Sequence, residues 1–351
     1  MQLSSLYFYL LLPLALLSCR QAPSQPGLKL GPGHQVIFLD SLQAAAAIVQ
    51  DKEEGFFDKI TSLDMSIQMG QTLPDTFNRK ELLAGYRNFL RHDVEGFSKE
   101  DRDLLDGAFR KAFALTEKVR PGLFPADIRL IKTKGTHYGP SVYYTRENYI
   151  VIPENELWEG NLNGLAEVML HEVFHIYSRY HPEVREALYR LIGFEPIGQP
   201  VLFPDSLARR LLLNPDGIRP DFAITLQIPG DSVPVEAIPL IISLRPHYNP
   251  ALPEFFSYLD FKLYPIKEGP EGFEVITQGG FRSPLPPPSR IPDFFKQIGD
   301  NTNYIIHPDE ILADNFVLLA LAQTGEEDTA LSKYSERGKE VLLGMEKILR
   351  K

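Results

Sequence analysis

Two histidines and a glutamate have the types and spacing in this chain that are best suited to chemistry. His171, Glu172 and His175 form the pattern His-Glu-x-x-His. On a helix, residues four apart lie on one face, so both imidazoles can bind one metal ion, with Glu172 beside that face as a general base. Residues 165–177 are otherwise mostly apolar, which predicts a buried helix.

The expected burial of this helix is itself an argument for a metal. Imidazole and carboxylate groups are costly to bury unless they are paired or bound to a cation. Two histidines at this spacing are typical of zinc sites, so we expect His171 and His175 to bind Zn²⁺. The alternative is a pair of core histidines that hydrogen-bond to the backbone.

A catalytic zinc site usually has three protein ligands, and two parts of the sequence offer the third. His181 has the spacing of the metzincin signature, but Ser178 stands where that signature has glycine. Residues 307–322 predict a largely apolar helix that carries Glu310 and Asp314 four apart. One of these acids can bind the metal, and the other can accept the second N–H of a ligating histidine. Glu310 could instead be an acid of the first helical turn.

The two predicted helices together resemble the gluzincin group of zinc metallopeptidases, in which the metal-binding helix is followed by a helix reading Glu-x-x-Ala-Asp. The resemblance implies that Glu310 is the third zinc ligand and that Asp314 supports a histidine ligand. It also implies hydrolysis of peptide bonds. Glu172 would take a proton from a zinc-activated water and pass it to the leaving amine.

A peptidase of this kind also needs a donor for the developing oxyanion and a surface that aligns the substrate. The candidate donors are Tyr304, Tyr248, His247 and His307, among which the sequence does not choose. A substrate peptide could add to an edge strand such as residues 149–152. Two other functions fit the same zinc chemistry: a zinc-binding surface protein without catalysis, and an amidase acting on cell-wall peptides.

The N-terminal residues predict export and anchoring. The first 18 residues contain no charged side chain and have the length of a signal peptide. They end in Leu-Leu-Ser followed by Cys19, which resembles the lipobox of bacterial lipoproteins. The resemblance implies acylation of Cys19 and attachment to a membrane of the bacterial cell envelope, with residues 19–34 as a flexible tether. The alternative is a secretory signal with an unrelated cysteine.

Composition restricts the possible partners. The chain has 351 residues with 44% hydrophobic and 23% charged side chains, which is ordinary for a globular protein. Its net charge is −10 and no Lys/Arg-rich helix is present, so we expect no nucleic-acid binding. Cys19 is the single cysteine, which excludes disulfide bonds within the chain.

The hydrophobic pattern predicts an α+β protein. Residues 35–125 have helical periodicity and form a predicted N-terminal helical lobe. Short strands at residues 128–131, 141–144 and 149–152 precede the motif helix within a unit of residues 126–195.

The C-terminal half predicts a change of structure and a return to helix. Residues 196–303 have β-type segments separated by Pro/Gly turns, which predicts an inserted antiparallel β subdomain. Residues 304–351 are helical and carry the third-ligand helix. We therefore expect a mainly helical, zincin-like metallopeptidase core with a short sheet before the motif helix and this β insertion.

Overall fold

The computed structural model describes residues 27–74, 76–325 and 330–351. The expected signal peptide, residues 1–18, and the acylation site Cys19 lie outside these residues. Within the described ranges, no helix has both the length and the apolar character of a membrane span. The expected tether is wrong at its C-terminal end, because strand β1, Leu28–Gly31, pairs there with the next strand.

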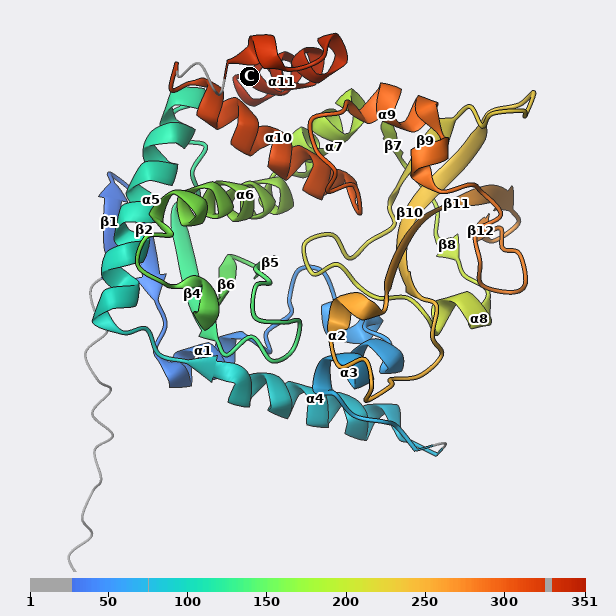
Figure 1. Ribbon diagram of the computed structural model, residues 1–351, viewed down its shortest axis with the longest axis horizontal. Helices are drawn as coiled ribbons and strands as arrows, with labels where there is room; N and C mark the ends of the chain where they lie inside the picture. The colour runs from blue at the N-terminus through green and yellow to red at the C-terminus, as the bar shows by residue number, and fades with distance from the viewer. Residues whose placement is uncertain (1–26, 75, 326–329) are drawn as a thin grey trace, which may run out of the picture.

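The first sheet is built mainly from the N-terminal half of the chain, at the left of Figure 1. Its main strand order is β1-β2-β4-β6-β5, and β3 pairs with β4. β2, β4 and β6 run parallel to one another, while β5 and β6 form an antiparallel hairpin. After β1, the strands are β2 His34–Phe38, β3 Val94–Glu95, β4 Asp127–Thr133, β5 Tyr144–Arg146 and β6 Tyr149–Pro153.

Three sequence-based predictions for this part of the chain are corrected. β6 is not an edge strand, because β4 and β5 flank it and all five of its residues are buried. The edge strand is β5. It begins only at Tyr144, the last residue of the predicted strand 141–144, because residues 141–143 are non-strand backbone. Residues 35–38 belong to β2, so the predicted N-terminal helical lobe begins with a strand.

Helices occupy most of the remaining N-terminal half and both ends of the C-terminal half. The helix with the His-Glu-x-x-His motif is α6, Leu162–Tyr180, as the apolar run predicted. The other helices of four residues or more are α1 Ser41–Ala47, α2 Phe56–Lys59, α3 Ser62–Met69, α4 Arg79–Asp93, α5 Lys99–Val119, α7 Pro182–Leu191, α8 Asp205–Ala208, α9 Pro292–Ile298, α10 Pro308–Ala322 and α11 Glu336–Leu349.

The second sheet forms the predicted β-rich part, at the right of Figure 1. Its order is β7-β9-β10-β11-β12-β8, antiparallel except for the parallel pair of β8 with β12. The strands are β7 Phe194–Pro196, β8 Val201–Leu202, β9 Phe222–Leu226, β10 Val235–Ser243, β11 Leu259–Gly269 and β12 Gly272–Val275. The fold is therefore α+β, as expected.

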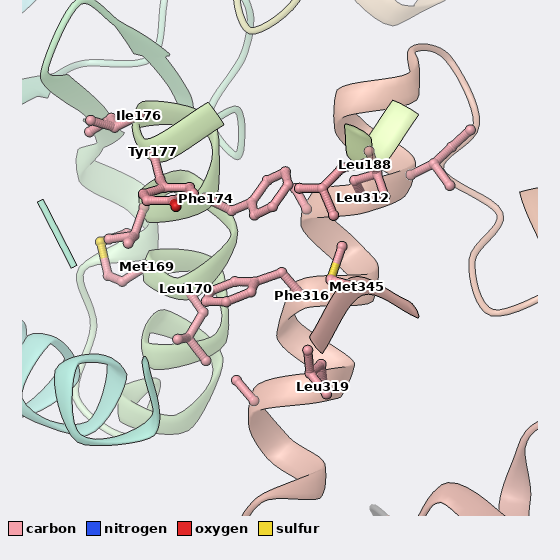
Figure 2. Packing of buried hydrophobic residues seen from close by; sticks show 14 of the residues in the cluster. Met169, Leu170, Phe174, Ile176, Tyr177, Leu188, Leu312, Phe316, Leu319 and Met345 are labelled. Atoms are coloured by element: carbon pink, nitrogen blue, oxygen red, sulfur yellow. The ribbon is translucent and has the colours of Figure 1, made fainter. Parts of the chain in front are cut away.

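The two helices that carry the predicted site residues pack directly on each other. Phe174 of α6 and Phe316 of α10 are fully buried, and their ring centroids lie 5.5 Å apart (Figure 2). Leu312 and Met345 belong to the same apolar cluster. Non-directional burial of these large side chains holds α10 against α6 at the level of the motif.

We predict that replacing Phe316 by alanine destabilises the protein by about 3–5 kcal/mol, because it removes a fully buried aromatic ring and leaves a cavity between α6 and α10. Urea unfolding followed by circular dichroism measures this change. Leu343 of α11 is half exposed, so Leu343→Ala should change stability by no more than about 0.5 kcal/mol. Equal effects of the two substitutions would contradict this packing.

Candidate metal centre

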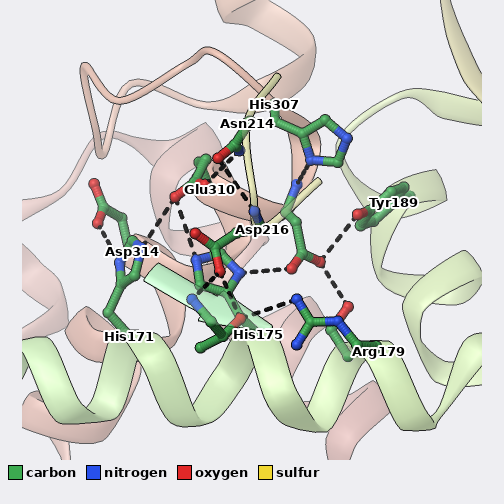
Figure 3. Close-up of polar contacts among 12 residues, drawn as sticks. His171, His175, Arg179, Tyr189, Asn214, Asp216, His307, Glu310 and Asp314 are labelled. Carbon is green, nitrogen blue, oxygen red and sulfur yellow. Dashed lines mark hydrogen bonds and ion pairs between the residues drawn. The ribbon is translucent and has the colours of Figure 1, made fainter. Parts of the chain in front are cut away.

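The two histidines of α6 converge on one carboxylate of α10. Their side chains rise from the same face of α6 toward Glu310 (Figure 3). Oε2 of Glu310 lies 3.0 Å from Nε2 of His171 and 3.3 Å from Nε2 of His175. His171, His175 and Glu310 each offer a ligand atom, and these atoms lie within 4.8 Å of one another. The three residues could therefore hold one metal ion.

One poorly bonded atom in this group supports that conclusion. His175 is 1% exposed, and its buried Nε2 makes no well-formed hydrogen bond, although Oε2 of Glu310 lies 3.3 Å away. A buried polar nitrogen without a well-formed hydrogen bond is costly, and a bound cation would remove that cost. Two imidazole nitrogens and one carboxylate oxygen are also the donor set of a catalytic zinc site.

A carboxylate supports each imidazole from its other side. Nδ1 of His171 lies 3.0 Å from Asp314 Oδ1, and Nδ1 of His175 lies 2.7 Å from Asp309 Oδ2. A carboxylate at Nδ1 favours the tautomer with its proton there, which leaves the Nε2 lone pair directed at the centre. The Asp314 contact matches the sequence-based expectation, whereas Asp309 was missed.

Asp309 is itself fixed by hydrogen bonds. Its Oδ1 accepts from the Ser178 hydroxyl at 2.6 Å and from the Tyr189 hydroxyl at 3.0 Å. Its backbone N–H donates to Nδ1 of His307, the N-cap of α10. The sequence did contain a signal for this contact. A second histidine ligand also requires a carboxylate at its Nδ1, and Asp309 is the acid directly before Glu310.

A loop next to the second sheet also contacts the candidate centre. The Asn214 amide donates to Oε1 of Glu310 at 2.6 Å. Asn214 lies in the segment that leaves this sheet after Leu211, which pairs with Ile242 of β10. The bond engages Oε1, so Oε2 is the oxygen that faces the histidines. No spacing in the sequence connects Asn214 with Glu310, so sequence reasoning could not find this contact.

Glu172 lies beside the candidate metal-binding group, and one of its carboxylate oxygens has no hydrogen-bond partner. The residue is 4% exposed, and its Oε2 is buried without a hydrogen-bond partner. Burial, reinforced by the negative charge of Asp216, raises the pKa of the Glu172 carboxyl to about 8. A carboxyl with such a pKa can both hold and release a proton near neutral pH.

A polar network adjoins the centre and covers part of the sheet edge. Asp216 Oδ1 accepts from the backbone N–H of Thr145 at 2.6 Å and from its hydroxyl at 2.5 Å. Arg179 donates to the Thr145 hydroxyl oxygen, to the backbone oxygen of Glu147 and to the Glu54 carboxylate, at 2.9, 2.9 and 2.8 Å. The edge of β5 is therefore already occupied at Thr145.

An open cleft of about 370 Å³ gives access to the centre, with His171, Glu172 and Glu310 in its wall. Tyr304 also lines the cleft, and its ring stacks on His171 with the centroids 6.1 Å apart. The other candidate oxyanion donors, His247, Tyr248 and His307, are not among the described residues that line the cleft.

His181 is not part of the group that could hold a metal, which is formed by His171, His175 and Glu310. Its Nδ1 lies 2.8 Å from the backbone oxygen of Tyr177, and its ring stacks on the Tyr177 ring at 4.1 Å. It ends α6 and begins α7. The chain turns at His181 between the two helices, and the metzincin-like spacing has no counterpart in this geometry.

Comparisons with known proteins leave the site to be judged on this geometry. No family model matches the chain, and no curated protein or solved structure matches it either.

Proposed function

We propose that the protein is a zinc metallopeptidase of the gluzincin type with a zincin-like catalytic core. The observation that carries this proposal is the convergence of His171, His175 and Glu310 on one point, with the unpaired carboxylate oxygen of Glu172 beside it. His171 and Glu310 line an open cleft together with Glu172, so a substrate can reach this side of the group.

The residues around the proposed zinc have separate roles. Zinc held by His171, His175 and Glu310 supplies Lewis-acid activation of water and of the substrate carbonyl. Glu172, whose Oε2 has no hydrogen-bond partner in the described structure, would accept the proton of the attacking water and deliver it to the leaving amine. Tyr304, which lines the cleft beside His171, is placed to donate to the oxyanion.

The substrate is proposed to be a peptide or protein. Because Asp216 occupies the Thr145 edge of β5, a peptide backbone would lie along residues 141–143, of which each lines the cleft. Acylation of Cys19 would hold the enzyme on a membrane of the bacterial cell envelope and would restrict it to substrates found there.

We predict that purified protein contains one zinc ion per chain and that Glu310→Ala lowers zinc affinity by more than about 100-fold. Asp314→Asn should lower the affinity by about 10–100-fold, because it removes the carboxylate that orients His171. Elemental analysis and competition with a chromogenic chelator measure these values. His181→Ala is the control and should leave zinc affinity within about twofold. A large loss in the His181 variant alone would reverse the ligand assignment.

We predict that Glu172→Gln keeps its zinc and loses peptide hydrolysis by at least about 10²–10⁴-fold, because the amide cannot accept a proton. Peptide cleavage by mass spectrometry and zinc content are measured on the same sample. Glu183→Gln, at an exposed position of α7, is the matched control and should retain activity.

Three outcomes would contradict the peptidase proposal. Full activity of the Glu172→Gln variant would remove the proposed mechanism. Bound zinc without cleavage of any peptide would favour a zinc-binding surface protein. Cleavage restricted to cell-wall fragments would favour the amidase.

A further inference from the structure

A second large pocket lies beside strand β10 of the second sheet. This β10 pocket, which Pro239, Leu240 and Ile241 of that strand help to line, has a volume of about 450 Å³. The cleft at the candidate metal centre has a volume of about 370 Å³. None of the described residues that line the β10 pocket also lines the cleft. A molecule in the pocket would therefore be separate from a substrate in the cleft.

The β10 pocket lies at a gap in the second sheet. β9 pairs with β10 at residues 235–237, and the chain around Leu211 pairs with β10 at Ile241 and Ile242. Pro239 lies between these two pairings. Because proline has no N–H to donate, a neighbouring strand cannot pair fully with it. The sequence of β10 itself therefore favours an opening at this point.

The walls of the β10 pocket are mainly apolar. Leu212, Ile218, Leu240 and Ile241 line it and are 3%, 5%, 7% and 7% exposed. A dry apolar cavity of roughly 150 Å³ holds benzene. The β10 pocket is about three times as large, so it has room for an apolar group of roughly ten to fifteen carbon atoms.

Two cationic side chains at the β10 pocket have N–H groups to spare. Lys59 donates to the backbone oxygen of Glu54 at 2.7 Å, and Arg219 donates to the backbone oxygen of Glu53 at 3.3 Å. Within the described ranges, neither cation forms a salt bridge with a carboxylate. Asp221 is the single acid among the described lining residues. The pocket therefore combines an apolar interior with an excess of positive charge.

The two cations disfavour each other. Burial, together with the positive charge of Arg219, lowers the pKa of Lys59. The negative charge of Asp221 acts in the opposite direction and offsets only part of this effect. An anionic group bound between the two cations would reduce their repulsion and would accept their free N–H groups.

We propose that the β10 pocket binds a carboxylate of the fatty-acid class, with its carboxylate at Lys59 and Arg219 and its chain among the apolar side chains. The inference goes beyond the proposed peptidase function and does not depend on it, because the pocket and the cleft have separate walls. Burial of each methylene group strengthens the binding, and the two cations select against a cationic head group.

The test is the binding of sodium decanoate to the full chain, loaded with zinc, measured by isothermal titration calorimetry below the micelle concentration. Hexanoate has four fewer methylene groups to bury, so we expect it to bind at least about tenfold more weakly than decanoate. Decyltrimethylammonium, with a similar chain and the opposite charge, should also bind at least about tenfold more weakly. Absence of decanoate binding, equal affinity for hexanoate, or tighter binding of the cation would overturn the inference.

A space-filling variant locates the chain of the ligand. Ala208 lines the β10 pocket, and Ala208→Phe should lower decanoate affinity by at least about tenfold, because the ring takes the place of the ligand. Ala46→Phe, at an exposed position of α1, is the matched control and should keep the affinity within about twofold. Circular dichroism checks that both variants fold. Equal affinity of the two folded variants would overturn the inference.

A charge variant locates the carboxylate of the ligand. Lys59→Gln combined with Arg219→Gln should lower decanoate affinity by at least about tenfold and should bring it close to that of decyltrimethylammonium. Both positions are exposed, so this variant keeps the test decisive if Ala208→Phe fails to fold. Lys80→Gln combined with Lys118→Gln, at exposed positions of α4 and α5, is the matched control. An unchanged preference for decanoate in the pocket variant would overturn the inference.

A carboxylate could also bind a metal ion in the cleft, and two further titrations separate the two places. Phe256→Ala alters the wall of the cleft, and treatment with EDTA removes metal ions. We expect decanoate affinity to stay within about twofold in both cases. A loss of affinity in both, with none in the β10 pocket variants, would place the ligand in the cleft and overturn the inference. Failure of peptide hydrolysis would leave all these binding results unchanged, so the two proposals fail separately.

Discussion

The whole site depends on the position of one buried carboxylate. Glu310 is 1% exposed and lies between two imidazoles that come from a helix more than a hundred positions earlier in the chain. Burying this carboxylate is costly unless its charge is balanced there. The hydrogen bond from Asn214 and the nearby imidazoles provide part of that balance, and a cation would provide the remainder. The apolar contact between α6 and α10 keeps these groups at bonding distance.

The surroundings of the centre contain more acidic than basic side chains. Glu172, Asp216, Asp309 and Asp314 lie near the histidines, while the charge of Arg179 is engaged by Glu54. Burial, together with repulsion from the negative charges of Asp216 and Glu310, raises the pKa of the Glu172 carboxyl. A dication at the histidines would relieve this repulsion. The electrostatics and the ligand geometry therefore favour the same kind of occupant.

Local patterns predicted the elements better than their pairing. α6 and α10 were predicted closely because helical periodicity and capping residues are local in sequence. The contact between the two helices at Glu310 was predicted from the two motifs, His-Glu-x-x-His and Glu-x-x-Ala-Asp, and not from helical periodicity. The edge position of β6 was predicted wrongly because strand order depends on contacts between distant segments, which hydrophobic alternation does not encode. Asn214 and Asp216 were out of reach for the same reason, since each acts from a loop across the tertiary fold.

The bond from Asn214 makes Glu310, the proposed metal ligand, sensitive to the position of the second sheet. A displacement of this loop by about one ångström would break it, since N–H···O bonds rarely exceed about 3.2 Å. Oε1 of Glu310 would then be free beside Oε2, and the carboxylate could bind through two oxygens instead of one. If Glu310 binds a metal as proposed, the number of its oxygens that take part would thus depend on how firmly the loop that carries Asn214 is held.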